Sequence, residues 1–554
     1  MYCDKENINI LTSLLVAHGV THAVVCPGSR NAAIVHNLNE CPDITCHGVT
    51  DERSAGFYAL GMAQALAQPV AVCVTSGTAL LNVAPAVAEA SMRHLPLVVI
   101  SADRPAQWIG QQVGQTLDQP GALSRFTLCN VNVAEPLDDS QRWYCNRQIN
   151  EALLAARQGG PVHINVPLSE PLFSFTTPAL PTERVITCPD VPADEASLQR
   201  CLLPFMQSSR PLLVIGQMDV PIDTSALSSH YVVLNEALSG KDGGVPFDEV
   251  LPLIGDDEEF QPEYVLYMGG TLVSKHIKQW LARCNRAVMM QVSPQGAVCD
   301  TFTHVTQVLR APVEQVLRVL EASDEDRETA APFVDHWNDL LTMAKYHYLQ
   351  FNPNFSQMLA VKVLERYIDT LDGNYVVHYA NSQPVRLANM VARHHVVCNR
   401  GVNGIEGTVS AAAGNSMVTR DMVLCVTGDL SFFYDRNALW PFGLKSNLRI
   451  LLLNNGGGGI FSQLPGLSDS PALERLVSGY HLSQAEEWYG CKYRSASGSE
   501  DLYSGITWLL NEETNRPLLL EVFTSMEKDQ RVLQQARESL KTAYQSWKKE
   551  NGKQ

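Results

Sequence analysis

Two neighbouring stretches decide the fold: VLCVTGDLSFFYDRNALW, residues 423–440, and LRILLLNNGGGGIF, residues 448–461. Each begins with an apolar run typical of a buried strand, and each run ends in a polar turn that contains glycine. The first turn, at Gly428-Asp429, leads into a helix. The spacing of the two turns is that of one strand–helix–strand crossover. The turns are therefore predicted to lie side by side at the carboxyl edge of a parallel sheet.

These turns carry the ligand types that Mg2+ prefers. Asp429 supplies a carboxylate, Asn455 an amide oxygen and Gly457 an exposed main-chain carbonyl, and phosphate oxygens could complete the octahedron. The glycines allow a diphosphate to approach the backbone, and the helix start after Leu430 offers N–H donors. Either turn alone is as readily an ordinary turn. Both together, each after a strand, favour a cofactor site.

The same alternation of strands and helices extends outward over the whole chain. HAVVCPG, PVAVCVTSG and LPLVVISADRP are typical of strands in a first unit, and RPLLVIG, HYVVLNE, YVLYMGG and AVMMQVSP in a second. The predicted fold is α/β, with three doubly wound parallel-sheet domains over residues 1–180, 190–335 and 350–554. The Pro- and Thr-rich stretch 171–192 is interpreted as a linker. Residues 537–554 are expected to form an exposed helix that frays.

Composition limits the function. The 554 residues carry a formal net charge of -17, which disfavours a nucleic-acid partner because such binding rests on Lys and Arg. The hydrophobic fraction of 45% suits a globular protein, and no apolar run is long enough for a membrane span. The 14 cysteines are scattered without a metal-binding pattern, which favours buried thiols in a reducing cytoplasm.

The N-terminus is predicted to be an amphipathic helix with Ile8, Leu11, Leu14 and Leu15 on one face.

The Asp429–Asn455 pair resembles the signature of enzymes that depend on thiamine diphosphate (ThDP). Further blocks resemble one branch of that superfamily, the 2-succinyl-5-enolpyruvyl-6-hydroxy-3-cyclohexene-1-carboxylate (SEPHCHC) synthases of menaquinone biosynthesis, the MenD family. These blocks are PGSRNAA (27–33), TDERSAGFYALG (50–61), TSGTALLN (75–82), SADRP (101–105), NSQPVR (381–386), CNRGVNGIEG (398–407), GDLSFFYDRNAL (428–439) and NNGGGGIFSQLP (454–465). The middle unit matches weakly, through GGTLVSK (269–275).

The resemblance implies a set of cofactor residues. Glu52 would hydrogen-bond the aminopyrimidine ring of ThDP, although a glutamate that opens a helix also serves as a surface residue that stabilises the helix dipole. Ile405 would hold the cofactor bent. The implied cofactor-binding residues are Glu52, Thr78, Asn82, Ile405, Gly428, Asp429, Leu430, Ser431, Asn455, Ile460 and Phe461, and Mg2+, with Mn2+ as the alternative metal, would bind Asp429, Asn455 and Gly457.

The resemblance also implies the reaction: 2-oxoglutarate is decarboxylated and its succinyl unit adds in a 1,4 fashion to isochorismate. Both substrates are dianions, so the site needs cations. By matching position, Ser29, Arg30, Arg104, Gln115 and Lys275 would face isochorismate, Ser382 and Arg386 the oxo acid, and Leu464 an apolar wall with Ile460 and Phe461. Arg400 would lie near the reacting centre, and Glu52, Arg400 and Arg30 would be catalytic. Any one of these cations could instead be a surface charge or a clamp on a carbonyl.

Three alternatives stay open. Another ThDP-dependent 2-oxo acid decarboxylase or carboligase, similar to acetolactate synthase, would share Glu52 and Asp429 but need fewer cations. A ThDP-binding regulator without activity would lack one of these motifs. A dinucleotide-dependent oxidoreductase is disfavoured because no GxGxxG follows a strand. The resemblance further implies a homodimer or homotetramer with active sites between subunits. Gly114 and Gly459 depart from the pattern, since each replaces a side chain expected there.

Overall fold

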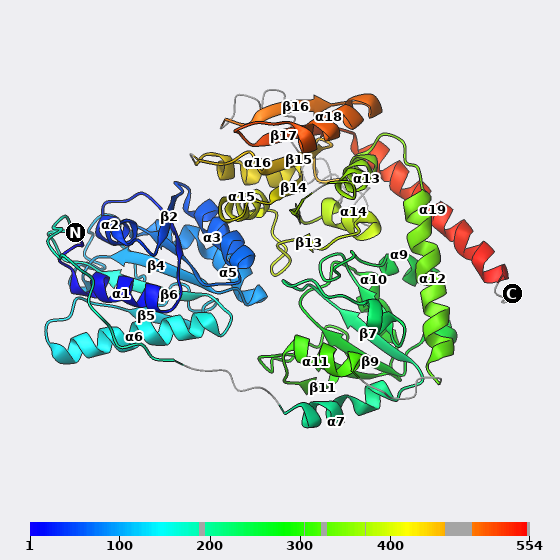
Figure 1. Ribbon diagram of the computed structural model, residues 1–554, viewed down its shortest axis with the longest axis horizontal. Coiled ribbons are helices and arrows are strands. Elements are labelled where there is room, and N and C mark those ends of the chain that lie inside the picture. The colour runs from blue at the N-terminus through cyan, green and yellow to red at the C-terminus, as the bar shows by residue number, and fades with distance from the viewer. Residues whose placement is uncertain are drawn as a thin grey trace.

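The computed structural model describes residues 1–187, 194–303, 305–322, 329–371, 373–441, 443–459 and 490–550. Its described strands form three sheets, and every strand pair in them is parallel. Figure 1 shows the three sheets as separate units, the first in blue, the second in green and the third in yellow to orange. The predicted fold class of three doubly wound parallel sheets is confirmed.

The first sheet has the order β2-β1-β3-β4-β6-β5. Its strands are β1 (His22–Val25), β2 (Thr45–Gly48), β3 (Val70–Val74), β4 (Leu97–Asp103), β5 (Cys129–Asn132) and β6 (Val162–Pro167). The helices of this unit are α1 (Glu6–Ala17), α2 (Ala32–Glu40), α3 (Glu52–Leu66), α4 (Thr78–Asn82), α5 (Ala84–Arg93), the 3-10 turn η1 (Ala106–Trp108) and α6 (Asp139–Arg157). The central strands β3 and β4 are buried along their whole length, as expected for strands covered by helices on both faces.

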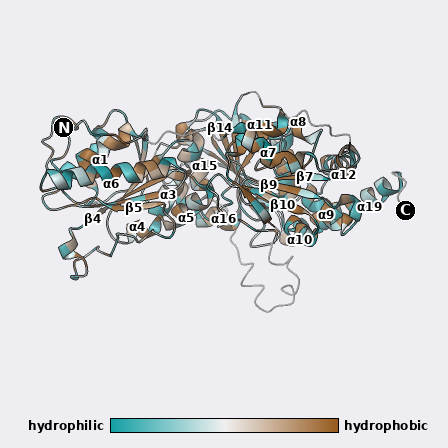
Figure 2. Ribbon diagram, turned by 90° about the horizontal axis from the view of Figure 1, so that it is seen from below, coloured by the Kyte–Doolittle hydropathy of each residue, from teal (hydrophilic) through white to brown (hydrophobic). Residues whose placement is uncertain are grey.

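The second sheet has the order β11-β10-β9-β7-β8. Its strands are β7 (Pro211–Ile215), β8 (Val232–Asn235), β9 (Tyr264–Met268), β10 (Val288–Val292) and β11 (Val305–Leu309). The helices are α7 (Glu195–Met206), α8 (Ser225–Ser228), α9 (Phe247–Ile254), η2 (Glu258–Phe260), α10 (His276–Arg283), α11 (Val313–Glu321) and the long α12 (Ala331–Gln350), which leads to the third unit. Figure 2 shows apolar strands such as β7 and β9 in brown, between helices that carry teal on their outer sides.

The third sheet has the order β13-β12-β14-β15-β17-β16. Its strands are β12 (Tyr375–Tyr379), β13 (Val396–Val397), β14 (Met422–Gly428), β15 (Leu448–Asn454), β16 (Lys492–Ala496) and β17 (Leu518–Phe523). The helices are α13 (Gln357–Ile368), α14 (Gln383–Val391), α15 (Thr408–Val418), α16 (Asp429–Tyr434), η3 (Arg436–Leu439), α18 (Ser499–Asn511) and α19 (Met526–Glu550). Counted within each unit, the strand order equals that of the first sheet.

This order determines where a ligand can bind. From β12 the chain moves to β13 on one side and then to β14 on the other, so the connections leave in opposite directions. Such a switch point leaves a crevice outside the carboxyl ends of the strands. Asn381 and Ser382 follow β12, and Asp429 follows β14, so both segments border this crevice.

The first and third units pack through α3 and α15. A Cβ on Gly61 would stand 2.1 Å from the carbonyl oxygen of Ala411, and one on Gly414 would stand 2.3 Å from that of Tyr58. The two helix backbones are therefore in direct contact, and only glycine allows this approach. Side chains of both helices belong to one continuous hydrophobic core. The two helices lie side by side in Figure 1.

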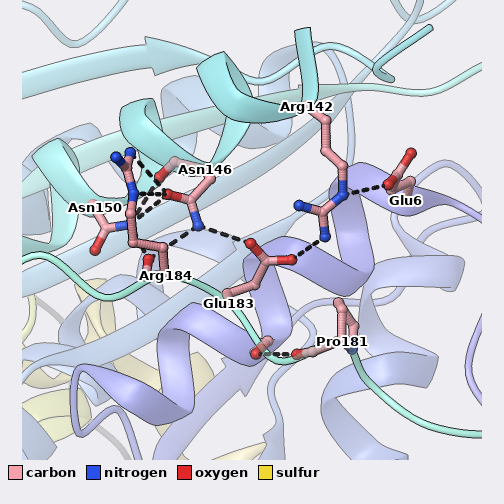
Figure 3. A network of polar contacts seen from close by, with 8 residues as sticks. Glu6, Arg142, Asn146, Asn150, Pro181, Glu183 and Arg184 are labelled. Carbon is pink, nitrogen blue, oxygen red and sulfur yellow. Dashed lines mark hydrogen bonds and ion pairs between the residues drawn. The ribbon is translucent and has the colours of Figure 1, made fainter. Parts of the chain in front are cut away.

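The interpretation of residues 171–192 as a linker is wrong for its described part. Glu183 is an ion-pair partner of Arg142 and accepts a hydrogen bond from Asn146 at 2.8 Å, and both partners lie on α6 (Figure 3). The carbonyl oxygen of Pro181 accepts a hydrogen bond from Ser13 at 2.8 Å. These polar anchors hold the segment against the first unit up to residue 187, and residues 188–193 lie outside the described residues.

Two expectations about the chain's helical ends need correction. The described part of the C-terminal helix does not fray: α19 packs against α12, and Leu540 and Tyr544 are buried because apolar residues recur along one face. On α1, the predicted apolar residues are buried, but so are Asn7 and Asn9 on the opposite sides, because other elements surround the helix. Within the described residues, no helix is both long and apolar enough to cross a membrane.

Candidate active site

A cavity occupies the switch point of the third sheet. Its lining comes from the ends of β14 and β15, from the segments that follow β12, β14 and β15, from the first residue of α13, from the loop before α15 and from α19. It consists of Gln357, Asn381, Ser382, Gln383, Pro384, Ile405, Gly428, Asp429, Leu430, Ser431, Leu453, Asn455, Gly457, Gly458, Gly459, Met526, Asp529, Gln530 and Leu533. The register of β14 and β15 pairs Gly428 with Leu453, so the two polar turns follow at the same level. The predicted proximity of Asp429 and Asn455 is confirmed.

Asp429 has an unusual environment for a carboxylate. Only 3% of the residue is exposed, and its Oδ2 has no hydrogen-bond partner among the described residues. Burial raises the pKa of this carboxyl to about 7, although main-chain N–H groups of Leu430 and Gly456 favour the charged form. A buried acceptor without a donor is costly unless something binds it. A cation at Oδ2 would supply the missing partner.

The glycine run after β15 is shaped by a residue that the sequence reasoning assigned no role. Asn454 is fully buried; its Oδ1 accepts a hydrogen bond from the N–H of Gly456 at 3.0 Å, and its Nδ2 donates one to Glu521 at 2.7 Å. The turn places Gly456 at a φ of 83° and Gly457 at 159°, in the region that favours glycine. Asn454 thus holds the turn while Asn455 lines the cavity.

The segment after β12 bears a strained residue. Ser382, at the N-terminus of α14, has a φ of 75°, which is rare for a residue with a side chain. Its neighbour Asn381 donates hydrogen bonds to the carbonyl oxygens of Asn399 at 2.6 Å and Gly404 at 2.8 Å. Asn381 therefore ties the loop that carries Ile405 to the end of β12, and both Ser382 and Ile405 reach the cavity.

Arg400 lies behind this loop and is buried. Its Nη1 donates to Oδ1 of Asn381 at 3.0 Å and its Nη2 to the carbonyl oxygen of Leu272 at 3.3 Å, while its Nε has no partner among the described residues. Through these bonds the guanidinium joins the third unit to the middle unit.

A second cavity brings Lys275 and Arg386 together, two cations that the resemblance assigns to different substrates. It lies between the middle and third units, and its other lining residues include Asp248, Glu249, His276 and Arg537. Nε of Arg386 is buried without a partner among the described residues. Burial and the neighbouring Arg400 lower the pKa of Arg386. Such a group gains most from an anionic partner.

The loop that carries Lys275 rests on a carboxylate that sequence reasoning missed. Glu236 is buried at the end of β8 and accepts hydrogen bonds from the N–H groups of Val273 at 2.8 Å and Ser274 at 2.7 Å. Burial raises the pKa of Glu236 to about 7, while these two donors and the nearby Arg400 lower it. No sequence motif marks this glutamate.

The first unit contributes Glu52 at the start of α3. Its Oε2 accepts a hydrogen bond from Asn82 at 3.2 Å, so two of the predicted cofactor residues are brought together. Asn82 and Thr78 are exposed and Glu52 is partly exposed. None of the three lines the cavity around Asp429.

The predicted isochorismate residues of the first unit lie at the carboxyl ends of its strands. Arg30 is buried and pairs with Glu170 at 3.0 Å, whereas Ser29 and Gln115 are exposed. The N–H of Arg104 donates to the side chain of Asp103 at 2.7 Å, and its Nε has no partner among the described residues.

A buried polar network beneath these residues was also missed. Gln119 accepts a hydrogen bond from the N–H of Gly77 at 2.7 Å and donates to the side chain of Asn165 at 2.8 Å. Asn165 in turn donates to Asp103 at 2.9 Å. The network links the loop before Thr78 to the start of the loop that carries Gln115. The predicted Ile460, Phe461 and Leu464 lie outside the described residues.

Comparison with known proteins agrees with this geometry. Residues 8–122 match the family model described as the thiamine pyrophosphate enzyme N-terminal TPP binding domain. An X-ray structure from Mycobacterium smegmatis, described as that of a thiamin diphosphate-dependent enzyme, covers 94% of this chain and 100% of its own with a TM-score of 0.68. At 16% identity this likeness shows the fold alone.

Sequence relatives extend over nearly the whole chain. The SEPHCHC synthase of Bacteroides thetaiotaomicron is 40% identical over 98% of this chain and 100% of its own. The SEPHCHC synthase of Porphyromonas gingivalis is 34% identical over 94% of this chain and 95% of its own. That of Desulfotalea psychrophila is also 34% identical, over 94% of this chain and 98% of its own. The chain thus belongs to the SEPHCHC synthase family of ThDP-dependent enzymes.

Proposed function

We propose that this chain decarboxylates 2-oxoglutarate and adds the succinyl unit to isochorismate, with ThDP held through Mg2+. The observation that carries the cofactor site is the buried Oδ2 of Asp429, which finds no hydrogen-bond partner in the described part of the chain, in a cavity that Asn455 and Gly457 also line. Carboxylate, amide and carbonyl oxygens are the ligands of a hard cation, for which Mn2+ could substitute. The similarity of the chain to SEPHCHC synthases over their full length supports the reaction.

The lining of the cavity suits the rest of the cofactor. Gly457, Gly458 and Gly459 present backbone without side chains, so a diphosphate can come close to them. A Cβ on Gly459 would stand only 3.2 Å from Nδ2 of Asn455, so glycine at this position leaves that amide its room. Ile405 supplies an apolar, stiff surface on the other side.

When bound, ThDP supplies a carbon nucleophile and an electron sink for decarboxylation. The chain's part is to orient the ring, hold the substrates and exclude water. Glu52 would accept or share a proton at the aminopyrimidine ring, and the hydrogen bond from Asn82 fixes the direction of its carboxylate. Arg400 would stabilise negative charge near the reacting carbon, since its guanidinium donates to Asn381, the residue that precedes Ser382.

Cations held in two places fit two dianionic substrates. Arg386 and Lys275 line one cavity together with Gln383, which also lines the cavity of Asp429, and this suits the carboxylates of the oxo acid. Arg30, Arg104, Ser29 and Gln115 belong to the first unit and would receive isochorismate. A protein with a net charge of -17 must concentrate such cations locally to attract dianions.

A complete site requires a second chain in this proposal. The described cavity around Asp429 is lined only by the third unit, and Glu52, Thr78 and Asn82 do not line it. A homodimer, or a homotetramer built from such dimers, would bring the first unit of one protomer to the third unit of its partner. The described cysteines are free thiols, which supports a cytoplasmic enzyme.

The test is a direct assay. Purified protein is mixed with ThDP, Mg2+ and 2-oxoglutarate, with and without isochorismate, while CO2 and the ultraviolet spectrum of the product are followed. The expected result is CO2 release coupled to consumption of isochorismate and dependent on both cofactors. Rapid turnover of pyruvate with isochorismate left untouched would instead identify a different ThDP-dependent carboligase.

A further inference from the structure

We propose that Asp529, in the first turn of α19, is a positioning residue that turns the side-chain oxygen of Asn455 toward the metal. The inference rests on the proposed function, in which Asn455 is a metal ligand. It assigns a role to the start of the C-terminal helix, for which the sequence predicts only an exposed, fraying end at residues 537–554.

Asp529 is held as an acceptor of hydrogen bonds. Its Oδ1 accepts from the N–H of Gln357 at 2.9 Å, and its Oδ2 accepts from the hydroxyl of Thr524 at 2.8 Å and from Nδ2 of Asn455 at 3.2 Å. A main-chain N–H can only donate, and an ionised carboxylate can only accept. Burial raises the pKa of Asp529, whereas the three donors lower it.

This arrangement settles which way the Asn455 amide faces. The oxygen and nitrogen of an amide lie on opposite branches of one planar group. Because the nitrogen is turned to the carboxylate of Asp529, the oxygen is turned away from it. Asn455 lines the same cavity as Asp429, whose Oδ2 has no partner among the described residues, so this oxygen is available to a cation bound there.

The sheet explains how a helix so far along the chain reaches this ligand. Strand β17 pairs with β15 in parallel, with Phe523 opposite Asn454, and the N–H of Thr524 donates to the carbonyl oxygen of Asn454 at 2.9 Å. The chain then turns into α19, whose first turn carries Asp529 beside Asn455. Two residues remote in sequence thus meet at one sheet edge.

The decisive variant is Asp529→Asn, which keeps the size of the side chain. Its oxygen must still accept from Gln357, so its new NH2 group takes the place of Oδ2 and faces Asn455. Asn455 then has to turn its own oxygen to that donor and present its NH2 group to the metal. The expected result is a roughly 10- to 100-fold weaker affinity for Mn2+ in the presence of ThDP, measured by electron paramagnetic resonance of free Mn2+.

A reciprocal exchange separates positioning from a merely structural role. In the double variant Asp529→Asn/Asn455→Asp, the NH2 group at position 529 donates to one oxygen of the carboxylate at position 455. The second oxygen of that carboxylate can then face the metal. The affinity for Mn2+ should therefore recover at least tenfold over that of Asp529→Asn. Loss of a helix-stabilising charge at the start of α19 would not be repaired by this exchange. Thr524→Val is the matched control: it removes another donor to the same oxygen and should leave Mn2+ affinity within about threefold of the parent.

The outcomes distinguish the two proposals. If Asp429→Ala binds Mn2+ and ThDP as tightly as the parent, the proposed cofactor site is wrong. If Asp429→Ala loses the metal but Asp529→Asn binds it like the parent, or the double variant stays as weak as Asp529→Asn, the positioning role of Asp529 is wrong while the proposed function stands.

Discussion

Glu89, on α5 of the first unit, accepts hydrogen bonds from the N–H of Gly401 at 2.9 Å and of the following Val402 at 2.7 Å in the third unit. Only 2% of Glu89 is exposed. A Cβ on Gly401 would stand 2.8 Å from that of Met92 on the same helix, so the loop lies directly on α5. The buried carboxylate therefore fixes the backbone next to Arg400.

We predict that Glu89→Gln lowers kcat/KM without loss of ThDP binding. The glutamine side chain can accept from only one of the two N–H groups and turns its own NH2 group toward the other. One buried N–H group therefore loses its acceptor, at a cost of about 1–3 kcal/mol. If that cost appears in the transition state, activity falls roughly 5- to 150-fold. Glu151→Gln on the exposed side of α6 is the control. Parent-like kcat/KM in folded Glu89→Gln would show that the loop does not depend on this contact.

The proximity of Asp429 and Asn455 and the fold class could be predicted because their signals are local. Each strand of the third sheet is a short apolar run with its polar turn attached, and the crossover length brings Asp429 and Asn455 to one edge. A site residue can therefore be predicted from the sequence when it directly follows a recognisable strand. The repeated strand order of the first and third sheets was not predicted, because the alternation of strands and helices does not determine which strands become neighbours.

The supporting residues could not be predicted because their partners are distant. Glu89, Glu236, Gln119 and Asp529 are single polar residues in segments that otherwise pattern as ordinary helices, strand ends or loops. Each becomes meaningful only when the fold places a foreign backbone or side chain next to it, as Asn455 lies next to Asp529. The linker interpretation was wrong for the same reason, since Glu183 is anchored by residues of α6.

Asp429→Ala should abolish activity through loss of the metal. The variant removes the one cavity-lining carboxylate whose Oδ2 lacks a partner among the described residues. Binding of ThDP, followed by quenching of tryptophan fluorescence, should then no longer respond to Mg2+. Its fold should be retained, because the parent pays to bury that carboxylate and alanine does not. Tight, Mg2+-dependent binding of ThDP to the variant would rule out this ligand.

Arg386→Ala should raise KM for 2-oxoglutarate far more than KM for isochorismate. Truncation of one partner of a buried charge pair costs about 2–5 kcal/mol, roughly 30-fold to several thousandfold in affinity. Arg537→Ala is a matched control, since Arg537 lines the same cavity but is already paired with Glu249 at 3.1 Å. Equal increases of both KM values in Arg386→Ala would reject this pocket for the oxo acid.

Acid should destabilise the protein partly through His163. This residue is fully buried beside the hydroxyl of Ser101 at 2.7 Å, and burial lowers its pKa to about 4 from an ordinary value of 6.5. As the pH falls, this histidine therefore takes up its proton in the unfolded chain before it does so in the folded protein. Its contribution leaves the free energy of unfolding unchanged above pH 6.5 and lowers it as the pH drops from 6.5 towards 4. Urea titrations across this range should give a shallower pH dependence for His163→Gln than for the parent. Parallel curves would exclude His163 as a source of acid sensitivity.

The last prediction concerns the division of the site between two chains. Glu52 belongs to the first unit and Asp429 to the third, and among the described residues the cavity of Asp429 is lined by the third unit alone. The exposed Leu81 next to Asn82, 46% accessible, would be covered if another protomer packed there. Glu52→Gln and Asp429→Ala should each be nearly inactive by themselves.

A heterodimer of these two variants gives a quantitative answer. If each site combines the first unit of one protomer with the third unit of its partner, one site carries both lesions and the other carries none. Differently tagged variants, co-expressed and purified through both tags, should then recover up to half of the parent's activity if the sites act independently. If each site were built within one chain, every site would carry one lesion and nothing would be restored. A verified heterodimer with no more activity than the single variants would therefore place Glu52 and Asp429 in the same chain's site.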